Sequence, residues 1–357
     1  MEVTLRDGSY VINFQFTAAD TRQIAGSLQA AGFDLIEVGH GVGMRAAEAG
    51  MGDSAATDAE YLEAASSVLD TAEFGMFLIP GIAKLEDIDL LASSGASFVR
   101  IGTNVDEVDT SEKYIERAKA RGLFVSANFM KSYAMAPAEF AKAAQLTEKY
   151  GTDLLCIVDS AGGMLTHELE DYFAATQDAT ELSLGFHGHD NLGLANANSL
   201  RAVELGAEVI DTSLQGLGRS AGNASTDIVL ALLERSGYDM GIDLLELLDI
   251  SMNYVQPLVQ RRGVESIDVV AGYAQFHSSF MGTINRYAGN YDVDPRRLII
   301  ELCKVDQVQA PPELVESIAK SLQGEGPGYS SRFGLHRYHG SEEEFRAGDL
   351  DQDDRAK

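Results

Sequence analysis

FGMFLIPGIAKLEDIDLLASSGASFVRIGT, residues 74–103, contains the repeating unit on which the fold of this chain depends. Its two ends are short apolar runs, and between them Leu85, Ile88 and Leu91 fall on one face of an amphipathic helix. A strand that is apolar along its whole length is buried on both faces, as in a parallel sheet covered by helices. The stretch therefore predicts a strand–helix–strand unit of an α/β protein.

Similar apolar runs recur along the first part of the chain and predict eight strands. They begin at residues 3, 33, 74, 97, 123, 153, 182 and 207. Helix-like segments separate them, as in TAADTRQIAGSLQAAG, which starts at Thr17. Eight such units fit a (β/α)8 TIM barrel better than an open doubly wound sheet, because no GxGxxG follows the first run.

The pattern changes after about residue 240, where helix-like segments continue without strands. We therefore predict a TIM-barrel catalytic domain at 1–240 and a helical C-terminal extension at 241–323. Residues 324–357 begin with glycine-rich GEGPGYSS and continue into an acidic stretch. Such a composition predicts a linker and a mobile acidic tail.

Charge and cysteine content limit the class of partner. The formal net charge is −28, and a field of this sign repels phosphate, so neither a nucleic acid nor an anionic membrane is expected as a partner. Cys156 and Cys303 are the only cysteines, and both lie in apolar segments, so a disulfide framework is not expected. With no membrane-length apolar stretch and no basic-then-apolar leader, the expected location is the cytoplasm.

Two motifs at strand ends carry candidate chemistry. In a barrel, the C-terminal ends of the strands line the active site, so Arg6 and Asp7 of VTLRD should lie in the mouth. His187 and His189 of GFHGHDN are two residues apart, so on a strand both side chains point to one face. Two imidazoles and a carboxylate suit manganese, magnesium, cobalt or zinc with open coordination positions, although structural histidines are the alternative.

The sequence resembles a known group of enzymes in these motifs. TLRDG, HGHDN and GLGRSAGN resemble the metal-dependent barrel lyases and synthases that include 4-hydroxy-2-oxovalerate aldolase, isopropylmalate synthase and hydroxymethylglutaryl-CoA lyase. The aldolase branch is most similar in IEVGHGVG, VDSAGG, NLGLANANS and GYAQFHSSF. The resemblance implies a divalent-metal-dependent aldolase that cleaves or forms a C–C bond next to a 2-oxo acid, by pyruvate enolate chemistry on a 4-hydroxy-2-oxo acid.

The resemblance also implies roles for individual residues. Asp7, His187 and His189 match the aldolase metal ligands, usually of manganese or magnesium. Asn223 of AGN matches an asparagine that binds metal in the lyase relatives, so it is a candidate extra ligand. Arg6 matches the arginine that holds the keto and enolate oxygen.

Candidate substrate contacts follow other strands. Ser160 of VDS lies near the family position whose backbone or hydroxyl contacts the substrate carboxylate. Asn104 stands where the aldolases commonly have histidine. His40 follows the second strand and either contacts substrate or stabilises its loop. Glu37 and Asp159, at strand ends, are candidates for orienting the metal ligands, with buried structural carboxylates as the alternative.

The sequence departs from the aldolases at Tyr10 and His277. The family has histidine three residues after the metal-binding aspartate and tyrosine at the second position, so the pair is exchanged in this chain. Because tyrosine has an ordinary pKa of about 10 and histidine one of about 6.5, we expect His277 to act as the base and Tyr10 to orient or relay. The alternative is that the exchange marks a lost activity or a different carbonyl substrate.

Two other functions remain as alternatives. One is acyl-CoA-dependent Claisen condensation of the isopropylmalate or citramalate synthase type, although those enzymes usually continue the first motif as DGEQ. The other is a scaffold subunit without catalysis. The aldolase branch typically binds an acylating aldehyde dehydrogenase, but CKVDQVQAPPELVES at 303–317 replaces the family's glycine-rich basic segment, so that partner is doubtful. A homo-oligomer is expected from the family.

Overall fold

The computed structural model describes residues 1–258 and 266–325, and the predicted tail lies outside them apart from its first residues. Within these residues a single parallel sheet has seven strands that pair in sequence order. Seven of the eight predicted apolar runs are thus confirmed as strands. They are β1 (Leu35–Glu37), β2 (Glu73–Leu78), β3 (Phe98–Asn104), β4 (Phe124–Met130), β5 (Leu154–Asp159), β6 (Ser183–Gly188) and β7 (Val209–Asp211).

The two edges of the sheet meet at the N-terminus. Glu2 forms bridges to Ile36 of β1 and to Thr212, which directly follows β7. The N–H of Val3 donates to the carbonyl of Thr212 at 2.9 Å. The sheet therefore curls into a TIM-barrel-like arrangement, but the full strand predicted from residue 3 is not found. The chain turns there into a 3₁₀ helix, Asp7–Ile12, which places the first motif above the sheet.

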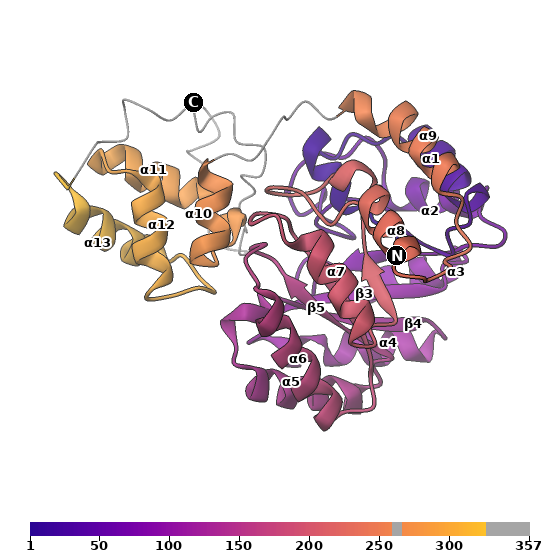
Figure 1. Cartoon of the computed structure of the whole chain (residues 1–357), viewed down its shortest axis with the longest axis horizontal. Coiled ribbons are helices and arrows are strands. Elements are labelled where there is room, and N and C mark those ends of the chain that lie inside the picture. The colour runs from indigo at the N-terminus through magenta and orange to yellow at the C-terminus, as the bar shows by residue number, and fades with distance from the viewer. Residues whose placement is uncertain (259–265, 326–357) are drawn as a thin grey trace.

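Helices follow the strands and cover the outside of the sheet (Figure 1). Capping boxes begin two of them, with the N-caps Thr17 and Thr57, because these hydroxyls accept the first free helical N–H groups. Of the predicted stripe on α3, Ile88 and Leu91 are buried, whereas Leu85 is 37% exposed. The helices are α1 (Ala18–Ala30), α2 (Asp58–Ser66), α3 (Leu85–Ser93), α4 (Glu112–Ala120), α5 (Pro137–Tyr150), α6 (Thr166–Ala179), α7 (Ala195–Glu204) and α8 (Thr226–Arg235).

The remaining helices form two groups. Helix α9 (Leu244–Ile250) packs on the same core as α1, through Leu247 and Ile250. A second apolar core holds together α10 (Ser266–Ala274), α11 (Met281–Tyr291), α12 (Pro295–Cys303) and α13 (Pro312–Leu322). Figure 1 shows this group beside the sheet, in orange and yellow. None of the helices in the described residues is long and apolar enough to cross a bilayer.

Helix α10 lies against the loops at the carboxyl ends of β5 and β6. The side-chain amide of Asn191 donates to the carbonyl of Asp268 at 3.1 Å. Gly163 approaches Gly272 so closely that a Cβ on Gly163 would lie 2.1 Å from the Gly272 carbonyl oxygen, so only glycine fits there. This contact brings the α10–α11 connection, which contains His277, to the mouth of the sheet.

Candidate active site

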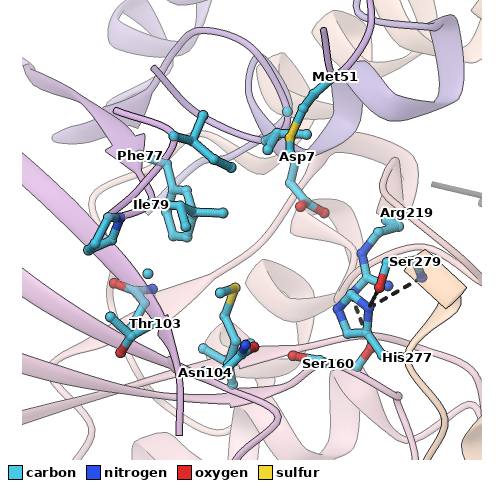
Figure 2. A pocket seen from close by; sticks show the side chains of 18 of the residues that line it. Asp7, Met51, Phe77, Ile79, Thr103, Asn104, Ser160, Arg219, His277 and Ser279 are labelled. Carbon is cyan, nitrogen blue, oxygen red and sulfur yellow. Dashed lines mark hydrogen bonds between the residues drawn. The ribbon is translucent and has the colours of Figure 1, made fainter. Parts of the chain in front are cut away.

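A cavity of about 510 Å³ opens at the carboxyl ends of the strands. Its lining comes from strand ends, from the first 3₁₀ helix and from the α10–α11 connection. Figure 2 shows Asp7, Arg219, Ser279 and His277 toward one side, with Phe77 and Ile79 across the cavity from Arg219. The side with Arg219 and His277 is thus charged and polar, whereas the opposite side combines apolar Phe77 and Ile79 with the uncharged polar side chains of Thr103 and Asn104.

Asp7, His187 and His189 lie together in this cavity. All three are buried, and their ligand atoms lie within 4.8 Å of one another. His187 and His189 come from the end of β6, where the two-residue spacing places both rings on one face, as the sequence predicts. The set offers two nitrogen ligands and one carboxylate, which suits a divalent transition metal.

Hydrogen bonds fix both imidazoles in the form that a metal ligand needs. Nδ1 of His187 lies 2.9 Å from Oδ2 of Asp211, and Nδ1 of His189 lies 3.2 Å from the carbonyl of Gly222. Because each Nδ1–H donates to an oxygen, the lone pairs are on the two Nε2 atoms, which lie 3.4 Å apart. Nε2 of His189 accepts from the guanidinium of Arg219 at 2.9 Å, and a cation beside Asp7 fits both lone pairs in exchange for this hydrogen bond.

Asn223 adds a further oxygen to this set. Its side-chain N–H donates to Oδ2 of Asp7 at 2.6 Å, and within the described residues its buried Oδ1 has no hydrogen-bond partner. Gly218 permits this position, since a Cβ there would lie 2.4 Å from Nδ2 of Asn223. An orphaned carbonyl oxygen beside the three ligands fits a cation, because a buried acceptor without a partner is otherwise costly.

Arg6 lies next to Asp7 and is fixed by a buried carboxylate. Its Nε donates to Oε2 of Glu37 at 2.7 Å, its Nη1 donates to Oδ1 of Asp7 at 2.7 Å, and its guanidinium lies over the ring of Phe77. Glu37 also accepts from Arg100 at 3.0 Å. The charges of Arg6, Glu37 and Arg100 thus alternate in sign, which compensates the cost of burying them. The same bonds hold the Arg6 guanidinium toward the space beside Asp7.

The protonation state of Asp7 suits a metal ligand. Burial alone raises the pKa of its carboxyl, but the positive charge of Arg6, with that of Arg219, outweighs burial and lowers the pKa below its usual range. Asp7 is therefore ionised at neutral pH and available as a negatively charged ligand.

The structure adds Asp211 to the residues that the sequence singled out. Its Oδ2 accepts from both His187 and Arg100, and the Arg100 charge lowers its pKa despite burial. Glu37 and Asp159 were the candidates for this orienting role. Glu37 instead holds Arg6, and Asp159 accepts from the N–H groups of the following loop at 3.2 and 2.9 Å. Asp211 is the last residue of β7, but Glu37 and Asp159 end their strands in the same way, so the sequence does not separate the three.

We expect Asp211→Ala to weaken divalent metal binding by roughly 10- to 100-fold, because the His187 ring loses the acceptor that fixes its tautomer and orientation. Asp211→Asn should lose less metal affinity than Asp211→Ala, since its amide oxygen can still accept from Nδ1–H of His187. Calorimetric metal titration measures both values, and circular dichroism checks folding. Wild-type metal affinity in a folded Asp211→Ala protein would contradict the orienting role.

His277 and Tyr10 both line the cavity, although they come from segments far apart in sequence. The ring of His277 is buried, and its Nδ1 lies 2.6 Å from Oγ of Ser279. Burial, with the positive charges of Arg219 and Lys131, holds the pKa of His277 well below its usual range. The imidazole is therefore neutral at neutral pH.

Ser160 and Asn104 also line the cavity. Oγ of Ser160 accepts from the backbone N–H of Lys131 at 3.0 Å, which leaves its own hydroxyl proton to donate elsewhere. Nδ2 of Asn104 donates to Glu107 at 2.9 Å, and its Oδ1 is buried without a partner in the described part of the chain. Both residues thus line the cavity, and each has hydrogen-bonding capacity that the bonds above leave unused.

His40 is not brought to the cavity. Its Nε2 lies 3.1 Å from the carbonyl of Gly52, its Nδ1 accepts from the N–H of Val42, and its ring stacks on Phe14. Burial lowers its pKa to about 4. Because both ring nitrogens hold loop backbone, the placement favours the loop-stabilising role over the substrate contact.

Arg219 is a second residue that sequence reasoning did not select. Its guanidinium lines the cavity, 2.9 Å from Nε2 of His189 and 3.0 Å from the carbonyl of Ser160. It also donates to Oγ of Ser278 at 2.6 Å. The signal in the sequence was a lone cation within the glycine-rich stretch GLGRSAG.

Comparisons with known proteins show which family the chain resembles. The model of the HMGL-like family matches residues 1–253. The 4-hydroxy-2-oxovalerate aldolase of Carboxydothermus hydrogenoformans is 37% identical over 90% of this chain and 96% of that protein, and the one of Moorella thermoacetica is 36% identical over the same shares. The carboxyl transferase domain of Rhizobium etli pyruvate carboxylase has a TM-score of 0.72 at 17% identity, covering 90% of this chain and 59% of that one, which shows a shared fold.

Proposed function

The chain belongs to the HMGL-like family, and on this premise we propose that it is a divalent-metal-dependent aldolase that cleaves or forms a C–C bond next to a 2-oxo acid. The observation that carries the proposal is the convergence of Asp7, His187 and His189 with the guanidinium of Arg6 in one cavity. Relatives named 4-hydroxy-2-oxovalerate aldolase support a 4-hydroxy-2-oxo acid as the substrate.

In the cleavage direction, the reaction begins when the 4-hydroxyl loses its proton to a base. The bond between C3 and C4 then breaks, C4 leaves as an aldehyde, and the bonding pair forms the pyruvate enolate. Protonation of this enolate at C3 gives pyruvate. The site must therefore stabilise negative charge on the C2 oxygen and supply one base.

Arg6 stabilises the charge that develops on the C2 oxygen. Glu37 and Asp7 fix its guanidinium before the substrate arrives, so little reorganisation is needed at the moment of reaction. Asp7, His187 and His189 would hold the cation, with Asn223 as an extra ligand, and a bound divalent cation would supply positive charge that stabilises the enolate. We favour manganese or magnesium, with cobalt and zinc as alternatives.

His277 is the base in this proposal, and Tyr10 orients or relays. Because both line the same cavity, the exchange relative to the aldolases keeps an imidazole and a phenol at the reacting centre. Nδ1 of His277 lies 3.3 Å from the backbone N–H of Ser279, which donates to it, and 2.6 Å from Oγ of Ser279. A lone pair on Nε2 needs the other tautomer, in which Nδ1–H donates to Ser279 Oγ and the Ser279 N–H gives up this acceptor. Ser160 and Asn104 bind the substrate, with Ser160 nearer to the charged side of the cavity.

We expect His277→Ala to lower kcat by roughly 10²- to 10³-fold and to leave metal affinity unchanged, since only the proton acceptor is lost. Because the pKa of His277 is lowered, the imidazole keeps its neutral form as the pH falls, so wild-type kcat/KM should decline only below pH 6.5. His167, which is exposed on α6, provides the control, and His167→Ala should have the kcat and metal affinity of wild type. An unchanged rate for His277→Ala when chemistry limits turnover would remove His277 from the mechanism.

The test of the function is release of pyruvate, followed by coupling to lactate dehydrogenase. Chelator-treated protein is incubated with 4-hydroxy-2-oxovalerate and longer 4-hydroxy-2-oxo acids, with and without Mn²⁺. Metal-dependent pyruvate release is the expected result. No release from any of these acids by metal-loaded protein would favour acyl-CoA-dependent condensation or a different carbonyl substrate.

We further propose that residues 1–3 complete an eight-stranded (β/α)8 barrel and that the chain divides into a catalytic domain at 1–240 and a helical extension at 241–323. The bridges of Glu2 to both edges of the sheet support the first statement. The separate apolar core of α10 to α13 supports the second.

A further inference from the structure

The charged side of the cavity contains a guanidinium that the proposed mechanism leaves without a role. Arg219 is 6% exposed and lies in the loop after β7, at the seam with the α10–α11 connection. Arg219 donates to Ser278, and the next residue, Ser279, lines the cavity and contacts His277. Arg219 is therefore held at the point where the two parts of the site meet.

One hydrogen bond of Arg219 is incompatible with a metal-loaded site. Nη2 donates to Nε2 of His189 at 2.9 Å, and this nitrogen has a single lone pair. The same lone pair faces the other ligand atoms of the site. It cannot accept a hydrogen bond and bind a cation at once, so filling the cation site releases an Arg219 N–H beside the ligands.

The position of this N–H suits a carboxylate rather than the other end of the substrate. Nη2 lies 3.0 Å from the carbonyl of Ser160, on the charged side of the cavity. Phe77 and Ile79 lie across the cavity and present apolar surface (Figure 2). A substrate with one anionic end is therefore oriented with its carboxylate toward Arg219 and its uncharged end toward the apolar side.

We propose that Arg219 binds the carboxylate of the 2-oxo acid, through the N–H that turns from His189 to the ligand when the cation site is filled. This inference rests on the proposed function, because it assumes that a 2-oxo acid binds beside Asp7, His187 and His189. It predicts that the affinity for the anion depends on the charge at position 219. The competing explanation is that Arg219 only ties its loop to Ser278.

The test is calorimetric titration of oxalate, a mimic of the pyruvate enolate, into full-length protein loaded with one equivalent of Mn²⁺. Arg219→Gln should weaken oxalate binding by roughly 10- to 100-fold, since a charged hydrogen bond is lost. Arg219→Lys should bind oxalate with an affinity between those of Arg219→Gln and wild type, because an ammonium keeps the charge but lacks the planar fork of the guanidinium. Ser278→Ala, which removes the tie and keeps the guanidinium, should bind oxalate like wild type.

Metal titration of each variant provides the second readout. Arg219→Gln should bind Mn²⁺ at least as tightly as wild type. The substitution removes a positive charge beside the metal ligands, and the same guanidinium competes with the metal for the Nε2 lone pair of His189. Equal oxalate affinity in Arg219→Gln and wild type would overturn the inference and leave the proposed function intact. If oxalate binding were weakened equally in Arg219→Gln and Ser278→Ala, Arg219 would act only by holding its loop to Ser278. This result would also overturn the inference. Loaded wild-type protein that binds no oxalate would overturn both.

Discussion

Asp7→Asn should abolish metal-dependent pyruvate formation, with kcat/KM lowered by about 10³-fold or more. Asp7 is the carboxylate that faces the two imidazoles, and its pKa is lowered so that it is ionised at neutral pH. Asparagine has nearly the same size but removes the negative charge that a divalent cation needs. Loss of several kcal/mol of transition-state stabilisation corresponds to this factor, since each 1.36 kcal/mol is tenfold. Metal titration should show a matching loss of affinity.

The control for Asp7→Asn is Asp89→Asn. Asp89 also accepts from arginine side chains, but it pairs with Arg117 and Arg121 away from the cavity residues. Asp89→Asn should therefore keep wild-type metal affinity and activity. If Asp7→Asn bound metal and cleaved substrate like wild type, while circular dichroism showed a folded protein, Asp7 would not be a metal ligand.

Arg6→Gln should lower kcat by roughly 10²- to 10³-fold with a smaller change in metal affinity. Its guanidinium is held by Glu37 and Asp7 before substrate binds, and removing one preorganised donor from a developing oxyanion typically has an effect of this size. Steady-state kinetics on metal-saturated protein measures the loss. Glu37 keeps its bond to Arg100, so the buried carboxylate retains one cationic partner in the variant.

Arg117→Gln is the matched control for Arg6→Gln, because it removes an arginine from a carboxylate pair on α4 outside the cavity. It should leave kcat unchanged. Arg6→Lys separates charge from geometry, since lysine keeps the charge but cannot bond Glu37 and Asp7 with one planar group. Full activity in folded Arg6→Gln would show that the enolate oxygen is stabilised elsewhere.

The sequence predicts the parts of the molecule that depend on local pattern. Continuous apolar runs mark the strands, and the two-residue spacing of His187 and His189 places both rings on one face. The rule that strand ends line a barrel mouth places Asp7 beside them. The first run is found only in part, because Met1, Glu2 and Val3 hydrogen-bond to the edges of the sheet, whereas the chain turns before it reaches Asp7.

The rest depends on contacts between distant segments. The orienting carboxylate is Asp211, and nothing in the local pattern distinguishes it from Glu37 or Asp159, which lie at similar strand ends. Arg219 meets Ser278 across 59 residues, so its direction depends on how α10 docks on the loops. His40 follows a strand as a site residue would, but its loop folds back and uses both of its ring nitrogens.

The most direct test of enolate chemistry in this cavity is exchange of the C3 protons of pyruvate in D₂O, measured by mass spectrometry of the recovered pyruvate. This exchange reports enolate formation without requiring the identity of the aldehyde. If a pyruvate enolate forms at this site, the exchange should need the divalent metal and be lost in Asp7→Asn. Wild-type protein that binds the metal and pyruvate but incorporates no deuterium would contradict pyruvate enolate chemistry at this site.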